Sequence, residues 1–184
     1  AAFEACVIRY GLAKTTLQKV ADEAELPRSL VRYFIGNRDE MVSMLINGMM
    51  ERTEREVAEA YPEGKPMSPH ELVNVVFDTL FDNSTSNSVV TELWFVAEHD
   101  ETVKARLLRL YERMQDGIVE QLALAGIGRS NVARRHTAYA LMSLGYGDAS
   151  FKFLTQKFEQ KNALKQIALA IVERLNAEGH GNEK

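Results

Sequence analysis

The sequence is poor in the residues that interrupt regular structure. Its 184 residues include only 4 prolines and 11 glycines. All-β sandwiches need turn residues every ~8–12 positions, and collagen-like or linker-rich chains need many more of both residues. These classes are excluded, and long helices are expected. The sequence contains no segment in which apolar and polar residues alternate strictly for long enough to indicate a strand.

Cysteine and long apolar runs are also scarce. Cys6 is the single cysteine, so no disulfide can form within the chain, and we expect it in the core. No run approaches the ~18–20 apolar residues of a membrane span, and no signal peptide opens the sequence. We therefore expect a cytoplasmic protein with no membrane partner. Because the sequence opens on Ala1 within a helical pattern, and not on Met, we also expect a preceding stretch of chain.

The groups that catalyse reactions or bind metals are too scattered to indicate an active site. The four histidines, at positions 70, 99, 136 and 180, stand far apart, and no glycine-rich phosphate loop is present. His99 lies beside Asp100 without a second histidine or carboxylate at helical ligand spacing, so we interpret Asp100 as a helix cap. We expect no enzymatic activity, no metal and no other cofactor.

The formal net charge of −4 would by itself argue against nucleic-acid binding. The charge is unevenly distributed, however. Residues 1–50 contain six basic and six acidic residues, so the remainder of the chain carries the whole −4. Residues 27–38 contain three arginines and no acidic residue. The first part of the chain therefore includes a local positive segment that the total hides.

Apolar residues at helical spacing predict nine helices. Three capping boxes mark helix starts, at Thr15 with Gln18, at Asn37 with Glu40 and at Ser68 with Glu71. A linker is expected over residues 61–69 and a polar break over 82–88. The expected helices cover residues 1–10, 15–24, 27–33, 38–60, 69–81 and 89–98, a stretch from the Asp100 cap to Ala125, and residues 131–154 and 161–177.

The second and third helices are short and closely joined, so they must cross steeply, as in a helix-turn-helix. Their expected apolar contacts are Val7, Val20, Ala24, Leu26, Leu30 and Val31. The polar face of the third helix would then carry Arg28, Ser29, Arg32 and Tyr33. Such a helix fits the DNA major groove, where arginine can donate two hydrogen bonds to guanine. Thr15, Thr16 and Arg38 are expected to bind phosphates.

The same stretch resembles the DNA-binding domain of TetR/AcrR-type transcriptional regulators. The matching residues are Thr15-Thr16, Val20-Ala21-Asp22-Glu23-Ala24, Ser29 to Phe34 and Gly36 to Met41. Glu25-Leu26-Pro27 stands where that family usually has Gly-Val-Ser, and Phe34-Ile35 where it usually has His-Phe. A run within residues 92–126, beginning Glu-Leu-Trp-Phe, is similar to the ligand domain of the BetI-like subset.

The resemblance implies a homodimer and a small-molecule pocket, and the residues themselves favour both. Small residues recur along 131–154 (Ala133, Ala138, Ala140, Ser143, Gly145, Gly147), and an apolar stripe follows 161–177 (Leu164, Ile167, Ala168, Ile171, Leu175). These two helices could form a four-helix interface across a two-fold axis. The candidate ligand-binding residues, for which plain core packing is the alternative, are Phe77, Phe81, Trp94, Phe95, His99, Met114, Met142 and Tyr146.

Together these features favour an all-α, one-component transcriptional regulator. Residues 1–45 would form the helix-turn-helix domain, and residues 46–184 the domain for ligand binding and dimerisation. The expected function is a ligand-responsive repressor that binds a palindromic DNA operator as a dimer. Two alternatives stay open: an all-α ligand-sequestering or protein-interaction module that does not read DNA, and a transcriptional activator with the same fold.

Overall fold

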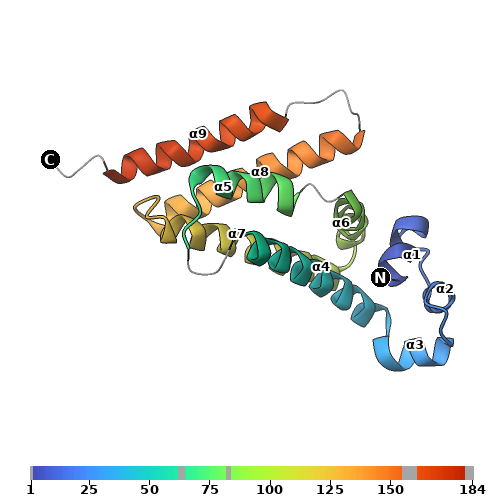
Figure 1. Ribbon diagram of the computed structural model, residues 1–184. Coiled ribbons are helices and arrows are strands. Elements are labelled where there is room, and N and C mark those ends of the chain that lie inside the picture. Colours follow the sequence, from blue (N-terminus) through green and yellow to red (C-terminus); the bar gives the residue numbers. More distant parts are fainter. Residues whose placement is uncertain (1, 62–64, 82–83, 155–160, 181–184) are drawn as a thin grey trace. The chain divides into compact units, whose positions relative to one another are not determined.

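The computed structural model describes residues 2–61, 65–81, 84–154 and 161–180. Every regular element in these ranges is a helix (Figure 1), which confirms the all-α prediction. Residues 62–64 of the expected linker and 82–83 of the expected polar break lie outside the described residues. The elements are α1 (Ala2–Tyr10), α2 (Leu17–Glu23), α3 (Arg28–Ile35), α4 (Arg38–Ala60), α5 (Pro69–Asn74), the π-helix η1 (Val75–Leu80), α6 (Ser84–Ala97), α7 (Glu101–Leu124), α8 (Asn131–Leu154) and α9 (Lys161–His180).

The chain forms two compact units. The first, called the head unit here, comprises Ala1–Arg52 and Thr85–Tyr111, and the second, the body unit, comprises Thr53–Ser84 and Glu112–Lys184. Helices α4 and α7 therefore contribute residues to both units. The expected division at residue 45 concerns function, and it stays a prediction.

Local capping signals determine where several helices begin, as predicted. At the start of α4, the amide of Asn37 donates to Glu40 Oε2 at 2.6 Å, and the amide of Glu40 donates back to Asn37 Oδ1 at 3.0 Å. Ser68 and Glu71 form the second capping box, and these hydrogen bonds hold the pKa of Glu71 below its usual value. Asp100 Oδ1 accepts from the backbone N–H groups two and three residues on, at 2.9 and 3.1 Å. Each bond satisfies an amide that the helix leaves unpaired.

Two helix predictions need correction. The helix expected over 69–81 is α-helical only to Asn74, and it continues as the π-helix η1. The helix expected to begin at Val89 begins at Ser84, so the polar break is shorter than expected. Serine, threonine and asparagine have only modest helix propensity, so the sequence favoured a later start.

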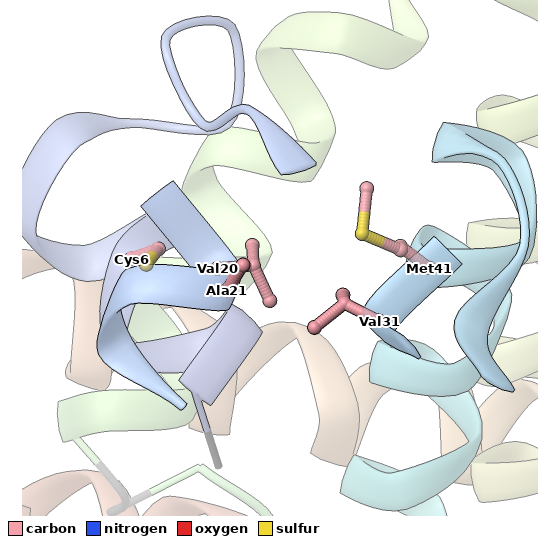
Figure 2. Packing of buried hydrophobic residues seen from close by; sticks show 5 residues of the cluster. All are labelled: Cys6, Val20, Ala21, Val31 and Met41. Carbon is pink, nitrogen blue, oxygen red and sulfur yellow. The ribbon is translucent and has the colours of Figure 1, made fainter. Parts of the chain in front are cut away.

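A small apolar core holds the first helices together. Figure 2 shows Val31 of α3 and Met41 of α4 pointing toward Val20 and Ala21 of α2. Cys6 of α1 completes the cluster, as expected, and its Sγ donates to the carbonyl of Lys19 at 3.4 Å. Burial raises the pKa of the Cys6 thiol.

The expected apolar contacts are only partly correct. Val7, Val20 and Val31 are buried, and Ala24 is half-buried. Leu26 and Leu30 are 45% and 37% exposed, so the prediction that they belong to the core is wrong. Neighbouring helix positions lie about 100° apart, so a short helix whose Val31 points inward turns Leu30 toward its flank.

An ion pair joins α1 to α4 beside this core. Arg52 donates through both Nη atoms to the two carboxylate oxygens of Glu4, at 2.8 and 2.6 Å. Glu4 is buried, and the hydrogen bonds from Arg52 lower the pKa of its carboxyl. Bidentate geometry makes this pair stronger than an ordinary surface ion pair.

The body unit has its own core around Phe77, Leu122, Leu141 and Val172, all at or below 2% exposure. Helices α8 and α9 run side by side (Figure 1), and η1 packs against α8. Gly145 of α8 packs closely against Phe81, because a Cβ atom at Gly145 would lie 2.7 Å from Cδ2 of Phe81.

We therefore expect Gly145→Ala to lower the free energy of unfolding by about 1–3 kcal/mol, since the added methyl group overpacks this contact. Gly117→Ala in α7 is the control. A Cβ atom at Gly117 would meet nothing within 4 Å, so better helix propensity should raise stability by about 0.5–1 kcal/mol. Urea denaturation of both variants measures the difference, and equal effects of the two substitutions would contradict the packing.

Candidate nucleic-acid interface

The turn between α2 and α3 depends on one residue in the left-handed conformation. Glu25 has φ +54°. Its amide donates to the carbonyl of Asp22 at 3.2 Å, and the amide of Leu26 donates to the carbonyl of Ala21 at 3.0 Å. These two bonds form a Schellman motif, in which glycine usually occupies the left-handed position. Glu25 is also where the resembling family usually has glycine, so this chain forms the same turn with a strained residue.

Helix α3 presents almost all of its side chains to solvent. It begins after Pro27, extends two residues beyond the predicted end at Tyr33, and buries only Val31. The four predicted DNA-reading residues, Arg28, Ser29, Arg32 and Tyr33, are all exposed. The prediction that this helix carries an exposed polar face is confirmed; DNA contact by its residues stays a prediction.

Arg28 and Arg32 are unpaired in the described part of the chain. Neither side chain forms an ion pair or a hydrogen bond there, whereas the side chain of Arg9 in the same unit pairs with Glu23 at 2.6 Å. All five N–H donors of each guanidinium are therefore available to a ligand. Such donors can bind guanine or phosphate without first breaking an internal bond.

The helix α3 also has an apolar flank, which was not predicted. Phe34 is 70% exposed and packs edge-on against Tyr33, with ring centroids 5.1 Å apart. Leu30 and Phe34 border an apolar cavity of about 220 Å³, which Met44 also lines. A helical projection of residues 28–35 would have placed Leu30 and Phe34 opposite the arginines.

The N-cap of α2 is Thr16, and not Thr15 as predicted. Thr16 is the N-cap, and its Oγ1 accepts from the amide of Lys19. Thr15 is buried, and its hydroxyl donates to the carbonyl of Gly11 at 2.8 Å. Gln18 donates to Asp22 at 2.7 Å and does not reach back to the cap. The predicted Thr15–Gln18 capping box is therefore wrong, because the preceding turn uses the Thr15 hydroxyl.

Arg38 is the first residue of α4 and is exposed. Its Nη2 donates to the carbonyl of Leu12, in the loop between α1 and α2, at 3.2 Å. A guanidinium has five N–H donors, so one is used and four remain for a phosphate. The hydrogen bond to Leu12 holds the Arg38 side chain against the loop between α1 and α2, which ends at the N-cap Thr16.

The candidate ligand-binding residues fall into two groups. Five belong to the body unit: Phe77, Phe81 and Met142 are buried, and Met114 and Tyr146 are half-buried. Phe81 and Tyr146 meet edge-on, with centroids 6.3 Å apart. Phe77 is fully enclosed in the core, which favours the packing alternative for that residue.

The other three candidates, Trp94, Phe95 and His99, belong to the head unit and are exposed. Trp94 Nε1 donates to the hydroxyl of Tyr111 at 3.0 Å. The packing alternative is wrong for Trp94 and Phe95, which are 49% and 67% exposed. Their role in ligand binding stays a prediction.

The α8–α9 pair of the body unit carries exposed apolar side chains. They are Val132, Tyr139 and Phe151 on α8 and Ile167 on α9, each more than half exposed. Of the predicted α9 stripe, Ala168 and Leu175 face the interior of the unit, whereas Ile167 faces solvent. Val132 and Tyr139 also line an open cavity of about 430 Å³ with Gln115, Arg135 and His136.

The described residues give no indication of a metal site or of a membrane span. Among these residues, no group of three or more His, Cys, Asp or Glu side chains could hold a metal ion. None of the helices in the same ranges is long and apolar enough to span a membrane.

The strained turn gives a direct test of the interface geometry. Glu25→Gly should raise the free energy of unfolding by roughly 0.5–1 kcal/mol, because glycine adopts a positive φ without steric cost. Ala24→Gly is the neighbouring control. Ala24 has φ −84°, so glycine there should lower stability by about 0.5–1 kcal/mol. Thermal denaturation of the two variants compares them, and a destabilised Glu25→Gly variant would contradict the left-handed turn.

The sequence matches no protein-family model and no curated protein. Solved structures, in contrast, are similar over nearly the whole chain. A TetR transcription regulator from Haloarcula marismortui superposes with a TM-score of 0.75 at 16% identity, covering 94% of this chain and 93% of that one. A proposed regulator from Pseudomonas aeruginosa gives 0.77 at 20% identity, covering 100% and 90%.

A third similar structure contains a small molecule. A proposed transcriptional regulator from Saccharomonospora viridis, in complex with choline, gives a TM-score of 0.69 at 15% identity, covering 94% of this chain and 91% of that chain. Likenesses at these identities concern the fold. The chain has the fold of TetR-family transcriptional regulators, with an N-terminal helix-turn-helix and a C-terminal helical domain.

Proposed function

We propose that this chain is a one-component transcriptional regulator that binds double-stranded operator DNA as a homodimer. The observation that carries the proposal is the surface of α3, where two arginines lie unpaired on a helix that buries only Val31. An exposed helix of this kind fits the major groove. The fold shared with TetR-family regulators supports the same conclusion.

Base reading is assigned to α3. Arg28 and Arg32 lie on one flank and can each donate two hydrogen bonds to O6 and N7 of guanine. Ser29 and Tyr33 lie at the centre of the exposed surface. Tyr33 and Phe34 offer apolar ring edges, which suit the methyl group of thymine. The operator is therefore expected to contain guanine close to thymine in each half-site.

Phosphate binding is assigned to the residues on either side of α3. Thr16 presents an exposed cap at the start of α2, and Arg38 keeps four free N–H donors at the start of α4. Phosphate contacts orient a protein on the duplex without reading sequence. The buried Thr15 side chain is left out of this set, since its hydroxyl is engaged inside the loop.

The dimer is assigned to α8 and α9, the helices near residues 131–154 and 161–177. Their exposed apolar side chains, Val132, Tyr139, Phe151 and Ile167, are the kind that subunit interfaces bury. A two-fold dimer would present two α3 helices to a palindromic operator, with half-sites about 34 Å or a multiple of it apart.

The response to a small-molecule effector is assigned to the remaining helices of residues 46–184. A structural neighbour solved with choline supports a small-molecule site in this fold. The coupling to DNA binding is assigned to helix α4, which contributes residues to both units and begins at Arg38. An effector that binds the DNA-incompetent arrangement more tightly would release the repressor, through a coupling of about 1–3 kcal/mol.

Two arginine variants distinguish base reading from phosphate binding. Against a duplex selected from a random pool by the wild-type chain, Arg32→Ala should weaken binding by ~1–3 kcal/mol, with a smaller loss on random duplex. Arg38→Ala should weaken binding to both duplexes alike and reduce the slope of affinity against salt by about 1. Fluorescence anisotropy over a salt titration measures both quantities.

Arg55→Ala is the matched control, because Arg55 is exposed on α4 in the body unit and the substitution removes the same charge. It should leave both affinities unchanged. Equal losses on selected and random duplex for Arg32→Ala would contradict base reading. The absence of any wild-type binding at low salt would favour the alternative of a ligand-sequestering or protein-interaction module.

The dimer interface is tested by placing charge on it. Tyr139→Glu and Ile167→Glu should each convert the dimer to monomer, because a buried unpaired carboxylate is strongly unfavourable at an interface. Leu124→Glu is the control, since Leu124 is an exposed apolar residue of α7 outside the α8–α9 pair. Analytical ultracentrifugation gives the subunit mass. A dimer that persists in both variants would place the interface elsewhere.

A further inference from the structure

The loop between α1 and α2 is held by side chains from two other helices of the head unit. The backbone N–H of Leu12 donates to Glu92 Oε2 of α6 at 2.9 Å. The backbone carbonyl of the same residue accepts from Arg38 Nη2 of α4 at 3.2 Å. The Leu12 side chain is 1% exposed. Leu12 is therefore fixed by a carboxylate, a guanidinium and the core at once.

The residues around Leu12 are shaped for this arrangement. Gly11 has φ +77°, and a Cβ atom there would lie only 3.0 Å from Glu92 Oε2. A residue with a side chain would therefore displace the carboxylate. Thr15 closes the other side of the loop through its hydroxyl bond to the carbonyl of Gly11. A hydrogen bond from an amide to a carboxylate is about twice as strong as one between neutral groups.

We propose that Glu92 is a positioning residue for DNA binding. It touches no DNA itself. By holding the amide of Leu12, it fixes the loop whose carbonyl orients Arg38 and whose end presents the Thr16 cap. A displacement of α6 would therefore misplace two phosphate contacts together. This inference rests on the proposed function, because it assigns Glu92 a role in that same interface.

A second bond supports the assignment. Arg106 Nη1 of α7 donates to the carbonyl of Asp39, in the first turn of α4, at 2.6 Å. The start of α4 is thus tied to α7 directly and to α6 through Leu12. Charged side chains from both helices bind backbone groups beside Arg38, where a small shift would change the direction of its free N–H donors.

The test compares Glu92→Ala with Glu98→Ala on the selected duplex. Glu98 follows α6, is exposed, and forms no hydrogen bond or ion pair in the described part of the chain. Both substitutions remove one negative charge, which by itself favours binding to DNA. We expect Glu98→Ala to bind as tightly as the wild-type chain or slightly more tightly, and Glu92→Ala to bind about three- to tenfold more weakly.

Two further measurements separate positioning from general destabilisation. Glu92→Gln, whose amide oxygen can still accept from Leu12, should recover part of the affinity lost in Glu92→Ala. In the Glu92→Ala/Arg38→Ala double variant the losses should not add, because both act through Leu12. The Leu12 amide should also exchange its hydrogen faster in Glu92→Ala than in Glu98→Ala.

The outcomes are distinguishable. If Arg32→Ala weakens binding but Glu92→Ala binds like Glu98→Ala, the Glu92 proposal is overturned and the proposed function stands. If the losses of Glu92→Ala and Arg38→Ala are fully additive, the positioning role is also overturned. If the wild-type chain binds no duplex at low salt, the proposed function fails and the Glu92 proposal fails with it.

Discussion

The candidate interface depends on the packing of Val31 in the small apolar core of the head unit. Helix α3 has only eight residues, and Val31 is the only one that is buried, while the half-buried Ile35 packs against the same core. Because α3 packs against Val20, Ala21 and Met41 through this one side of the helix, the side chains of residues 28–30 and 32–34 stay exposed, where a ligand can reach them. The scarcity of core contacts thus leaves most of the helix exposed, as the proposed recognition surface requires.

Because this core is small, hydrogen bonds and ion pairs around it also stabilise the head unit. The left-handed Glu25 sets the crossing of α2 and α3, and the Asn37–Glu40 box starts α4 directly after α3 ends. Glu4 and Arg52 join α1 to α4, and Leu12 is held between Glu92 and Arg38. None of these contacts uses a side chain of α3. Stability and accessibility are therefore supplied by different residues.

Signals that act over one helical turn could be predicted from the sequence. The caps at Asn37, Ser68 and Asp100 are confirmed because each side chain meets backbone two or three residues away. Predictions that depended on more distant partners were less successful. Thr15 and Thr16 are adjacent threonines that the sequence does not distinguish. Thr15 turns inward because its hydroxyl donates a hydrogen bond to the carbonyl of Gly11. The exposure of Leu30, like the contact of Glu92 with Leu12, follows from tertiary packing that helical periodicity does not contain.

The central claim is that a two-fold dimer reads DNA through α3, and selection from a pool of random duplexes by the wild-type chain tests it most directly. The account predicts enrichment of an inverted repeat whose half-sites contain guanine near thymine, with centres about 34 Å or a multiple of it apart. Recovery of a pool as random as the starting one, after repeated rounds at low salt, would contradict it.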